Sequence, residues 1–256
     1  MFLAIDAGNS NVVFGLYDET EKIWINQFRL ETEESKLISQ LSKKLPTYFL
    51  EHTINPSDIS AIGFSSVAPE INATIKEFCE NYFGIIPYTL NPKSYKKLPI
   101  KTLRPTEIGS DLMCNVMAAF TKTKKATLII DFGTALTFTA VDGLGEILGI
   151  NIAPGLKTAI KSLSATTSKL PEVALKLPKS ALGKNTVHAI QAGVLYGYIS
   201  LVKGMIDTIE KETQLQFHII ATGGLSSVLT PLEKVVQEID KNLTLEGLRL
   251  ITLENS

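Results

Sequence analysis

The hydrophobic and polar positions of the chain form one pattern that occurs twice. The apolar run 3–5 leads into Asp6-Ala7-Gly8-Asn9-Ser10, and a second apolar run follows at 12–15. A similar run at 128–130 leads into Asp131-Phe132-Gly133-Thr134-Ala135, followed by 136–141. Each copy predicts a strand, a tight Asp-x-Gly turn and a second strand. The two copies open the two halves of the chain, which indicates duplication of one supersecondary unit.

After this pattern, each half continues with a third strand and then with alternating helices and strands. Pro69 suits the first position of a helix, where its missing N–H costs nothing, and Pro46 is expected to break the helix in which it lies. The first half predicts strands at 22–30, 61–67 and 86–90 and helices at 33–51, 69–83 and 109–121. The second half predicts strands at 146–152, 217–221 and 248–253 and helices at 156–170, 186–212 and 225–240.

This order of elements predicts the fold class. Three consecutive strands followed by alternating helices and strands are typical of an α/β fold in which helices cover a mixed sheet. We therefore expect two duplicated α/β lobes, residues 1–122 and 123–256. A cleft between two such lobes is the natural place for a ligand.

Composition and charge narrow the function classes. The chain has 256 residues, of which 45% are hydrophobic and 20% charged, as in an ordinary globular protein. Its net charge is -1 and the basic residues are interspersed with acidic ones, so nothing resembles a nucleic-acid-binding surface. No apolar run reaches the roughly 18 residues of a membrane span, and the N-terminus lacks a basic signal region. Two cysteines, too few for a disulfide framework, favour a reducing, cytoplasmic location.

The two Asp-x-Gly turns are the first candidates for chemistry. Glycine lets backbone N–H groups approach a phosphate, and an aspartate at a strand end can hold Mg²⁺ directly or through water. A plain polar hairpin would explain one such turn, but the symmetric pair favours phosphate binding. Thr222-Gly223-Gly224, between a strand and a helix, is a weaker candidate of the same kind.

Asp111 is the second candidate. It follows Gly109-Ser110 at the start of a predicted helix, where an acid is also explained by a favourable interaction with the helix dipole. The sequence has no Walker-type phosphate loop and no G-x-G-x-x-G motif after a strand. Its three histidines have no zinc-ligand spacing.

Taken together, these motifs resemble a known family. In order and approximate spacing the chain is similar to type III pantothenate kinase along nearly its whole length. The matching segments are Asp6–Ser10, Gly109–Asp111, Asp131–Ala135, Pro154-Gly155, Leu182-Gly183-x-Asn185-Thr186 and the helix 189–197.

The resemblance implies a fold and a reaction. The fold would be the duplicated ribonuclease-H-like lobe of the acetate kinase–actin–hexokinase superfamily, with the nucleotide between the lobes. The reaction would be ATP-dependent phosphorylation of pantothenate to 4'-phosphopantothenate, the first step of coenzyme A biosynthesis. The family also implies a homodimer, Mg²⁺ with ATP, and a monovalent cation, K⁺ or ammonium.

The resemblance also implies residue roles. Asp111 would be the catalytic base, Asp6 would lie near Mg²⁺, and Asp131 would hold the monovalent cation. The ATP site would comprise Asp6, Ala7, Gly8, Asn9, Ser10, Asn11, Val12, Val13 and Thr134. The pantothenate pocket would comprise Gly109, Ser110, Asp111, Leu112 and Thr186.

Some positions depart from the family pattern. Leu112 stands where an arginine is expected to meet the carboxylate of the substrate, Thr139 stands where an aspartate is frequent, and Ile150-Asn151 replace part of a glycine-rich stretch. We hypothesise that Arg104 compensates for the missing arginine. Two alternatives therefore stay open: a kinase for another small alcohol, and a non-catalytic nucleotide-binding regulator similar to the Bvg accessory factor proteins.

Overall fold

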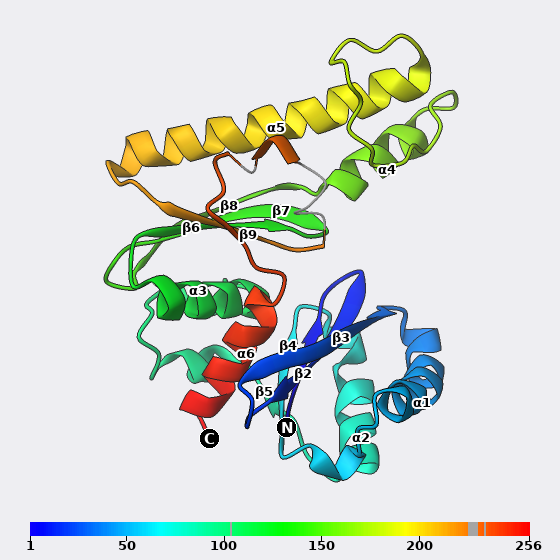
Figure 1. Cartoon of the computed structure of the whole chain (residues 1–256), viewed down its shortest axis with the longest axis vertical. Coiled ribbons are helices and arrows are strands. Elements are labelled where there is room, and N and C mark those ends of the chain that lie inside the picture. Colours follow the sequence, from blue (N-terminus) through cyan, green and yellow to red (C-terminus); the bar gives the residue numbers. More distant parts are fainter. Residues whose placement is uncertain (103, 225–229, 233) are drawn as a thin grey trace. The chain divides into compact units, whose positions relative to one another are not determined.

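The chain folds into two compact units. The computed structural model describes residues 1–256 except 103, 225–229 and 233. One unit contains residues 1–118 and 242–256, and the other contains residues 119–241 (Figure 1). The C-terminal segment 242–256, which the sequence pattern places in a lobe of residues 123–256, groups with the first unit by its contacts.

The first unit is built on a five-stranded mixed sheet. The strand order is β3-β2-β1-β4-β5. The strands β1, β2 and β3 are antiparallel neighbours, whereas β4 runs parallel to β1 and β5 runs parallel to β4. The bounds are Phe2–Ala7 (β1), Asn11–Asp18 (β2), Ile23–Glu31 (β3), Ala61–Ser66 (β4) and Tyr88–Thr89 (β5). The strand predicted at 86–90 is therefore only two residues long.

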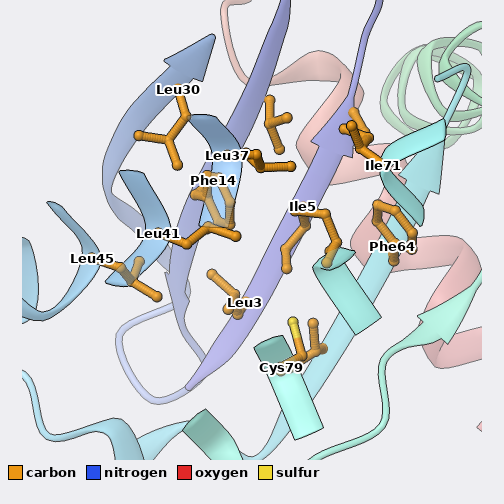
Figure 2. Close-up of a cluster of buried hydrophobic side chains, with 14 of the residues drawn as sticks. Leu3, Ile5, Phe14, Leu30, Leu37, Leu41, Leu45, Phe64, Ile71 and Cys79 are labelled. Carbon is orange, nitrogen blue, oxygen red and sulfur yellow. The ribbon is translucent and has the colours of Figure 1, made fainter. Parts of the chain in front are cut away.

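Two helices pack on one face of this sheet. Leu37, Leu41 and Leu45 recur every fourth residue on α1 (Glu34–Glu51), and all three are fully buried. They lie with α2 (Asn72–Phe83) over the apolar side chains of β1, β2 and β4 (Figure 2). The prediction that Pro46 breaks α1 was wrong, because the helix continues through it.

The last helix, α6, contacts β1 and β4 of the same sheet. The prediction of a strand at 248–253 was wrong, because Leu243–Glu254 is helical. Two glycines allow its close approach: a Cβ on Gly63 would overlap the Thr252 side chain, and a Cβ on Gly247 would overlap the Cys114 backbone of α3 (Ser110–Thr123). Packing between these elements thus decides the conformation of a segment whose pattern is ambiguous.

The second unit repeats the first topology. Its strand order is β10-β9-β6-β7-β8, with β6, β7 and β8 antiparallel and with β9 and β10 added in parallel. The bounds are Thr127–Phe132 (β6), Ala135–Val141 (β7), Ile147–Pro154 (β8), His218–Thr222 (β9) and Glu238–Ile239 (β10). The predicted duplication of two α/β lobes is confirmed.

The long helix α5 (Thr186–Thr213) lies along one face of the second sheet beside α4 (Leu156–Thr166) (Figure 1). Among the described residues it is the one helix whose length and apolarity would suit a membrane span. Its residues Leu195, Ile199 and Val202 are buried in the core of the second unit.

The helix predicted at 225–240 lies partly outside the described residues. Its described part contains the short 3₁₀ turn Thr230–Leu232 and the strand β10 instead of a helix.

Candidate functional site

In the first unit, Asp6 lies near the end of β1 and precedes the loop to β2. The amide of Gly8 donates to the Asn11 carbonyl at 3.0 Å and closes this turn. The hydroxyl of Thr32 donates to the Gly8 carbonyl at 2.7 Å and ties the loop to the end of β3. Asn9, Ser10 and Asn11 are exposed. This loop therefore offers amide, hydroxyl and backbone groups to a ligand from a fixed position.

The remaining residues of the predicted ATP loop are less accessible. Ala7 and Val12 are fully buried in the core, and Val13 is half-buried. The side chains of Ala7 and Val12 cannot reach a ligand, so any contact of these two residues with a nucleotide would come from their backbone.

A network of hydroxyl groups leads from the Asp6 carboxylate to the start of α3. Ser65 lies on β4 in register with Asp6, and its hydroxyl donates to Asp6 Oδ1 at 2.8 Å. The hydroxyl of Ser110 lies 2.9 Å from that of Ser65 and accepts from the Ser66 amide at 3.1 Å. The strand-end carboxylate is thus connected to the first residue of α3.

Asp111 follows in the first turn of α3. Burial raises the pKa of its carboxyl, and the amide hydrogen bonds of Leu112 and of Asp111 itself oppose this shift. The Leu112 amide donates to Oδ1 at 2.8 Å. The residue keeps part of its surface accessible. A raised pKa makes this carboxylate a stronger base than an ordinary aspartate.

Cys114 lies one helical turn after Asp111 and is fully buried. Burial raises the pKa of its thiol well above the usual value, and the nearby carboxylates of Asp6 and Asp111 raise it further. The thiol is therefore neutral and a poor nucleophile. The hydrogen bonds from Asp6 through Ser65 to Ser110 bring the carboxylate of Asp6 to the residue that precedes Asp111.

The second unit has an equivalent turn. Asp131 precedes the end of β6, and the exposed Thr134 lies in the turn to β7. The Thr134 carbonyl accepts from the Gly155 amide at 3.0 Å and from the Thr158 hydroxyl at 2.8 Å, so the first turn of α4 is fixed beside it. Amide groups at a helix start and in a tight turn suit an anionic ligand.

Gly223 meets Asp131 at the ends of β9 and β6. It has a φ of 87°, and an added Cβ would overlap Asp131 Oδ1 and the Phe132 backbone. Only glycine fits this conformation without strain. The segment Thr222-Gly223-Gly224, the weaker candidate for phosphate binding, therefore lies against the Asp131 carboxylate of the stronger candidate turn.

The predicted residues fall into two groups. Asp6 and 109–112 belong to the first unit, whereas Asp131, Thr134 and Thr186 belong to the second. Thr186 is exposed at the start of α5, where the preceding Asn185 side chain accepts from the His188 amide at 2.9 Å.

The positions that depart from the family pattern differ in their burial and in their hydrogen-bond partners. Leu112 is partly exposed beside Asp111. Arg104 is exposed and pairs with Glu107 at 3.1 Å, a type of surface pair that contributes little to stability. Thr139 is buried on β7, and its hydroxyl has no hydrogen-bond partner in the part of the chain that the structure describes.

The carboxylate of Asp6 suits a magnesium ion that binds together with the phosphates of a substrate. Within the described ranges, no three His, Cys, Asp or Glu side chains form a metal cage. Mg²⁺ does not need one, because it commonly binds through one or two carboxylates, water molecules and the phosphates of its substrate. A single strand-end carboxylate such as Asp6 meets this requirement.

Sequence reasoning missed Ser65. The available signal was the repeat itself, since Ser65 and Thr222 occupy the same register beside Asp6 and Asp131. Aligning the two halves of the sequence could have revealed a hydroxyl residue, Ser65 or Thr222, at the end of the strand parallel to each central strand.

The chain matches known proteins over its full length. The model of the type III pantothenate kinase family matches residues 2–208. Curated type III pantothenate kinases of Citrifermentans bemidjiense and Geotalea uraniireducens are 40% and 39% identical over 100% of this chain and over 100% and 99% of their own lengths.

Solved structures show the same fold at lower identity. A Campylobacter jejuni protein assigned to the Baf family of transcriptional activators has a TM-score of 0.59 at 22% identity, covering 99% of this chain and 98% of its own. Component A of the (R)-2-hydroxyglutaryl-CoA dehydratase of Acidaminococcus fermentans has a TM-score of 0.59 at 11% identity, covering 100% and 99%.

Proposed function

The chain belongs to the type III pantothenate kinase family, and from this premise we propose a role for each part of its site. The reaction is the phosphorylation of pantothenate with ATP in coenzyme A biosynthesis. The observation that carries the proposal is the position of Asp111, a partly buried carboxylate in the first turn of α3, directly after Ser110, whose hydroxyl is linked through Ser65 to the strand-end carboxylate of Asp6.

Asp111 is the catalytic base. Phosphoryl transfer depends mainly on positioning and charge neutralisation. Asp111 accepts the proton of the pantothenate hydroxyl while the oxygen attacks the γ-phosphorus of ATP, and ADP leaves with the electron pair of the broken P–O bond. The raised pKa favours this role because a base holds a transferred proton better as its pKa rises towards the working pH.

The turns hold the nucleotide and its cations. In the first unit, the exposed loop 9–11 contacts ATP phosphates and Asp6 holds Mg²⁺ directly or through water. The family resemblance implies a phosphate contact for the exposed Thr134 of the second unit as well. When bound, Mg²⁺ neutralises charge on the phosphates. Asp131 holds the monovalent cation, K⁺ or ammonium. The contact between Gly223 and Asp131 supports this role, because it fixes the direction of the carboxylate.

Residues 109–112 of the first unit contact pantothenate, and the family resemblance implies the same role for Thr186 of the second unit. We further infer a cytoplasmic homodimer. The second unit has exposed apolar side chains that a second copy could cover, among them Ile152 (71% exposed) and Leu182 (82%). Mass measurement in solution tests this: a monomer at micromolar concentration would contradict it.

The activity test is ADP production with ATP, Mg²⁺, pantothenate and saturating K⁺ or ammonium. Turnover that requires both pantothenate and Asp111, with Asp111→Asn as the control, is the expected result. Nucleotide binding without turnover would favour the regulatory alternative.

A second candidate function rests on Leu112. Its apolar side chain at the position of the expected arginine favours an acceptor without a carboxylate. ADP production with an uncharged alcohol, but none with pantothenate, would support it.

A further inference from the structure

Ser65 is a fully buried serine whose hydroxyl has a charged partner. It donates to Asp6 Oδ1 at 2.8 Å from the neighbouring parallel strand. A buried hydroxyl is costly unless it is hydrogen-bonded, and a bond to a carboxylate is roughly twice as strong as a bond between neutral groups. Ser65 therefore restricts the direction in which the Asp6 carboxylate points.

The hydrogen bonds continue from Ser65 to the start of α3. With the proton of the Ser65 hydroxyl directed at Asp6, Ser110 is the donor in the 2.9 Å contact between the two hydroxyls. The Cys114 thiol is a further hydrogen-bond partner of Ser65. The other acceptor open to Ser110, the Ser66 carbonyl, is farther away at 3.2 Å. The Ser66 amide donates to Ser110 in turn. Such a chain of donors, all directed at one carboxylate, strengthens each of its bonds.

The duplicated fold offers an independent observation. Thr222 on β9 is in register with Asp131, as Ser65 on β4 is with Asp6. Thr222 is also buried, with 1% of its surface exposed. Both sheets therefore have a buried hydroxyl residue beside the carboxylate at the end of the central strand. Apolar residues fill most other buried strand positions of both units.

We propose that Ser65 is a positioning residue of the kinase reaction, which orients Asp6 towards the metal–nucleotide complex and links it through Ser110 to the helix that carries Asp111. This inference rests on the proposed function, since it takes Asp6 as the carboxylate that faces the metal. One chain of hydrogen bonds would then fix the position of the Asp6 carboxylate, which faces the metal, relative to that of the base Asp111. The rate of phosphoryl transfer is sensitive to the relative position of these groups, because a misplacement of a reacting group by about 1 Å can reduce the rate about 100-fold.

The test compares Ser65→Ala, Ser65→Thr and Ser94→Ala. Ser94 is a matched control, because it is also buried in the first unit and its hydroxyl bonds Tyr88 and the Asn91 amide. Binding of a magnesium complex of a non-hydrolysable ATP analogue is measured by calorimetry, and kcat and KM are measured for both substrates. Partners of metal ligands typically contribute about 10- to 100-fold to affinity or activity, so we expect a loss of this size in nucleotide affinity for Ser65→Ala. The KM for pantothenate should not change.

The controls separate positioning from stability. Ser94→Ala should lower Tm and leave nucleotide binding intact, whereas Ser65→Thr should restore binding because it keeps the hydroxyl. Wild-type affinity in Ser65→Ala, or an equal loss in Ser94→Ala, would overturn the proposal.

A double-mutant cycle covers the case in which Ser65→Thr does not fold. If the chain of hydrogen bonds is real, Ser110→Ala should have a smaller effect in the Ser65→Ala background than in the wild type. Fully additive effects would contradict the link. A wild-type protein that binds the nucleotide complex but does not phosphorylate pantothenate would refute the proposed function alone, because the binding comparison would still test Ser65.

Discussion

The backbone of Gly109 lies directly against the carboxylate of Asp111. A Cβ added to Gly109 would overlap Asp111 Oδ1 and would also approach the Val67 side chain at 3.5 Å. The same Oδ1 accepts from the Leu112 amide. The absence of a side chain at Gly109 therefore allows the carboxylate to fold back onto the start of its own helix.

Gly109→Ala tests this relationship. The added methyl group should displace the Asp111 carboxylate while the hydrophobic core stays intact. A displacement of about 1 Å can reduce the rate about 100-fold, so we expect a loss of this order in kcat with little change in Tm. Wild-type kcat in a folded Gly109→Ala protein would show that the position of Asp111 does not limit the reaction.

The pH dependence of kcat should follow the ionisation of Asp111. The base must be deprotonated to accept a proton, so the rate should fall as the pH drops through its pKa. Burial raises this pKa, which places the acid limb of the profile above the value of about 3.9 of an ordinary aspartate. Asp111→Asn should lower kcat by about 10²–10⁴-fold, the usual contribution of general-base catalysis. An acid limb that Asp111→Asn leaves in place would assign it to another group.

Asp111→Asn should lower kcat but raise the stability of the folded protein at neutral pH. Because the folded state raises the pKa of Asp111, the folded protein binds the proton more tightly than the unfolded chain does. Stability therefore falls as the pH rises from the unfolded pKa through the folded pKa, and the cost remains at neutral pH. Asp111→Asn removes this cost, so its Tm should be higher than that of the wild type at pH 7. The gain should disappear at a pH below both pKa values, where the wild-type carboxyl is protonated as well.

Most of the fold could be predicted from the sequence, and the predicted site residues remain predictions, for identifiable reasons. The turns after Asp6 and Asp131 were predictable because an apolar strand, a polar turn and a second strand form a local pattern. The last helix was not, because the short apolar run 248–253 also suits a strand, and the contact of Gly247 with Cys114 spans much of the chain. The network of Ser65 depends on strand register, which the pattern of a single segment does not reveal.

Asp131 provides a test of the monovalent-cation site. If its carboxylate holds K⁺ or ammonium, Asp131→Ala should lose the activation by these ions, with a decrease in rate at least as large as the about 10- to 100-fold typical of groups around metal ligands. The measurement is the rate as a function of K⁺ concentration, with choline maintaining the ionic strength. A wild-type enzyme that is fully active without K⁺ or ammonium would eliminate this role for Asp131.

Leu112 provides the sharpest test of the substrate. If the carboxylate of pantothenate lies beside this position, Leu112→Arg should supply the missing guanidinium group. A hydrogen bond to a charged group contributes about 1.5–3 kcal/mol, so the KM for pantothenate should fall by about tenfold or more. Leu112→Lys is the matched control, because it adds the charge without the two-pronged geometry and should improve KM less.

The alcohol analogue of pantothenate, which lacks the carboxylate, completes this experiment. Leu112→Arg should not improve its KM, because no anion is present to meet the arginine. If Arg104 already serves the carboxylate in the wild type, Arg104→Ala should raise the KM for pantothenate, and Leu112→Arg should restore it. An unchanged KM in Arg104→Ala would eliminate that compensation. A wild-type protein that prefers the uncharged analogue would instead identify Leu112 as an adaptation to a different acceptor.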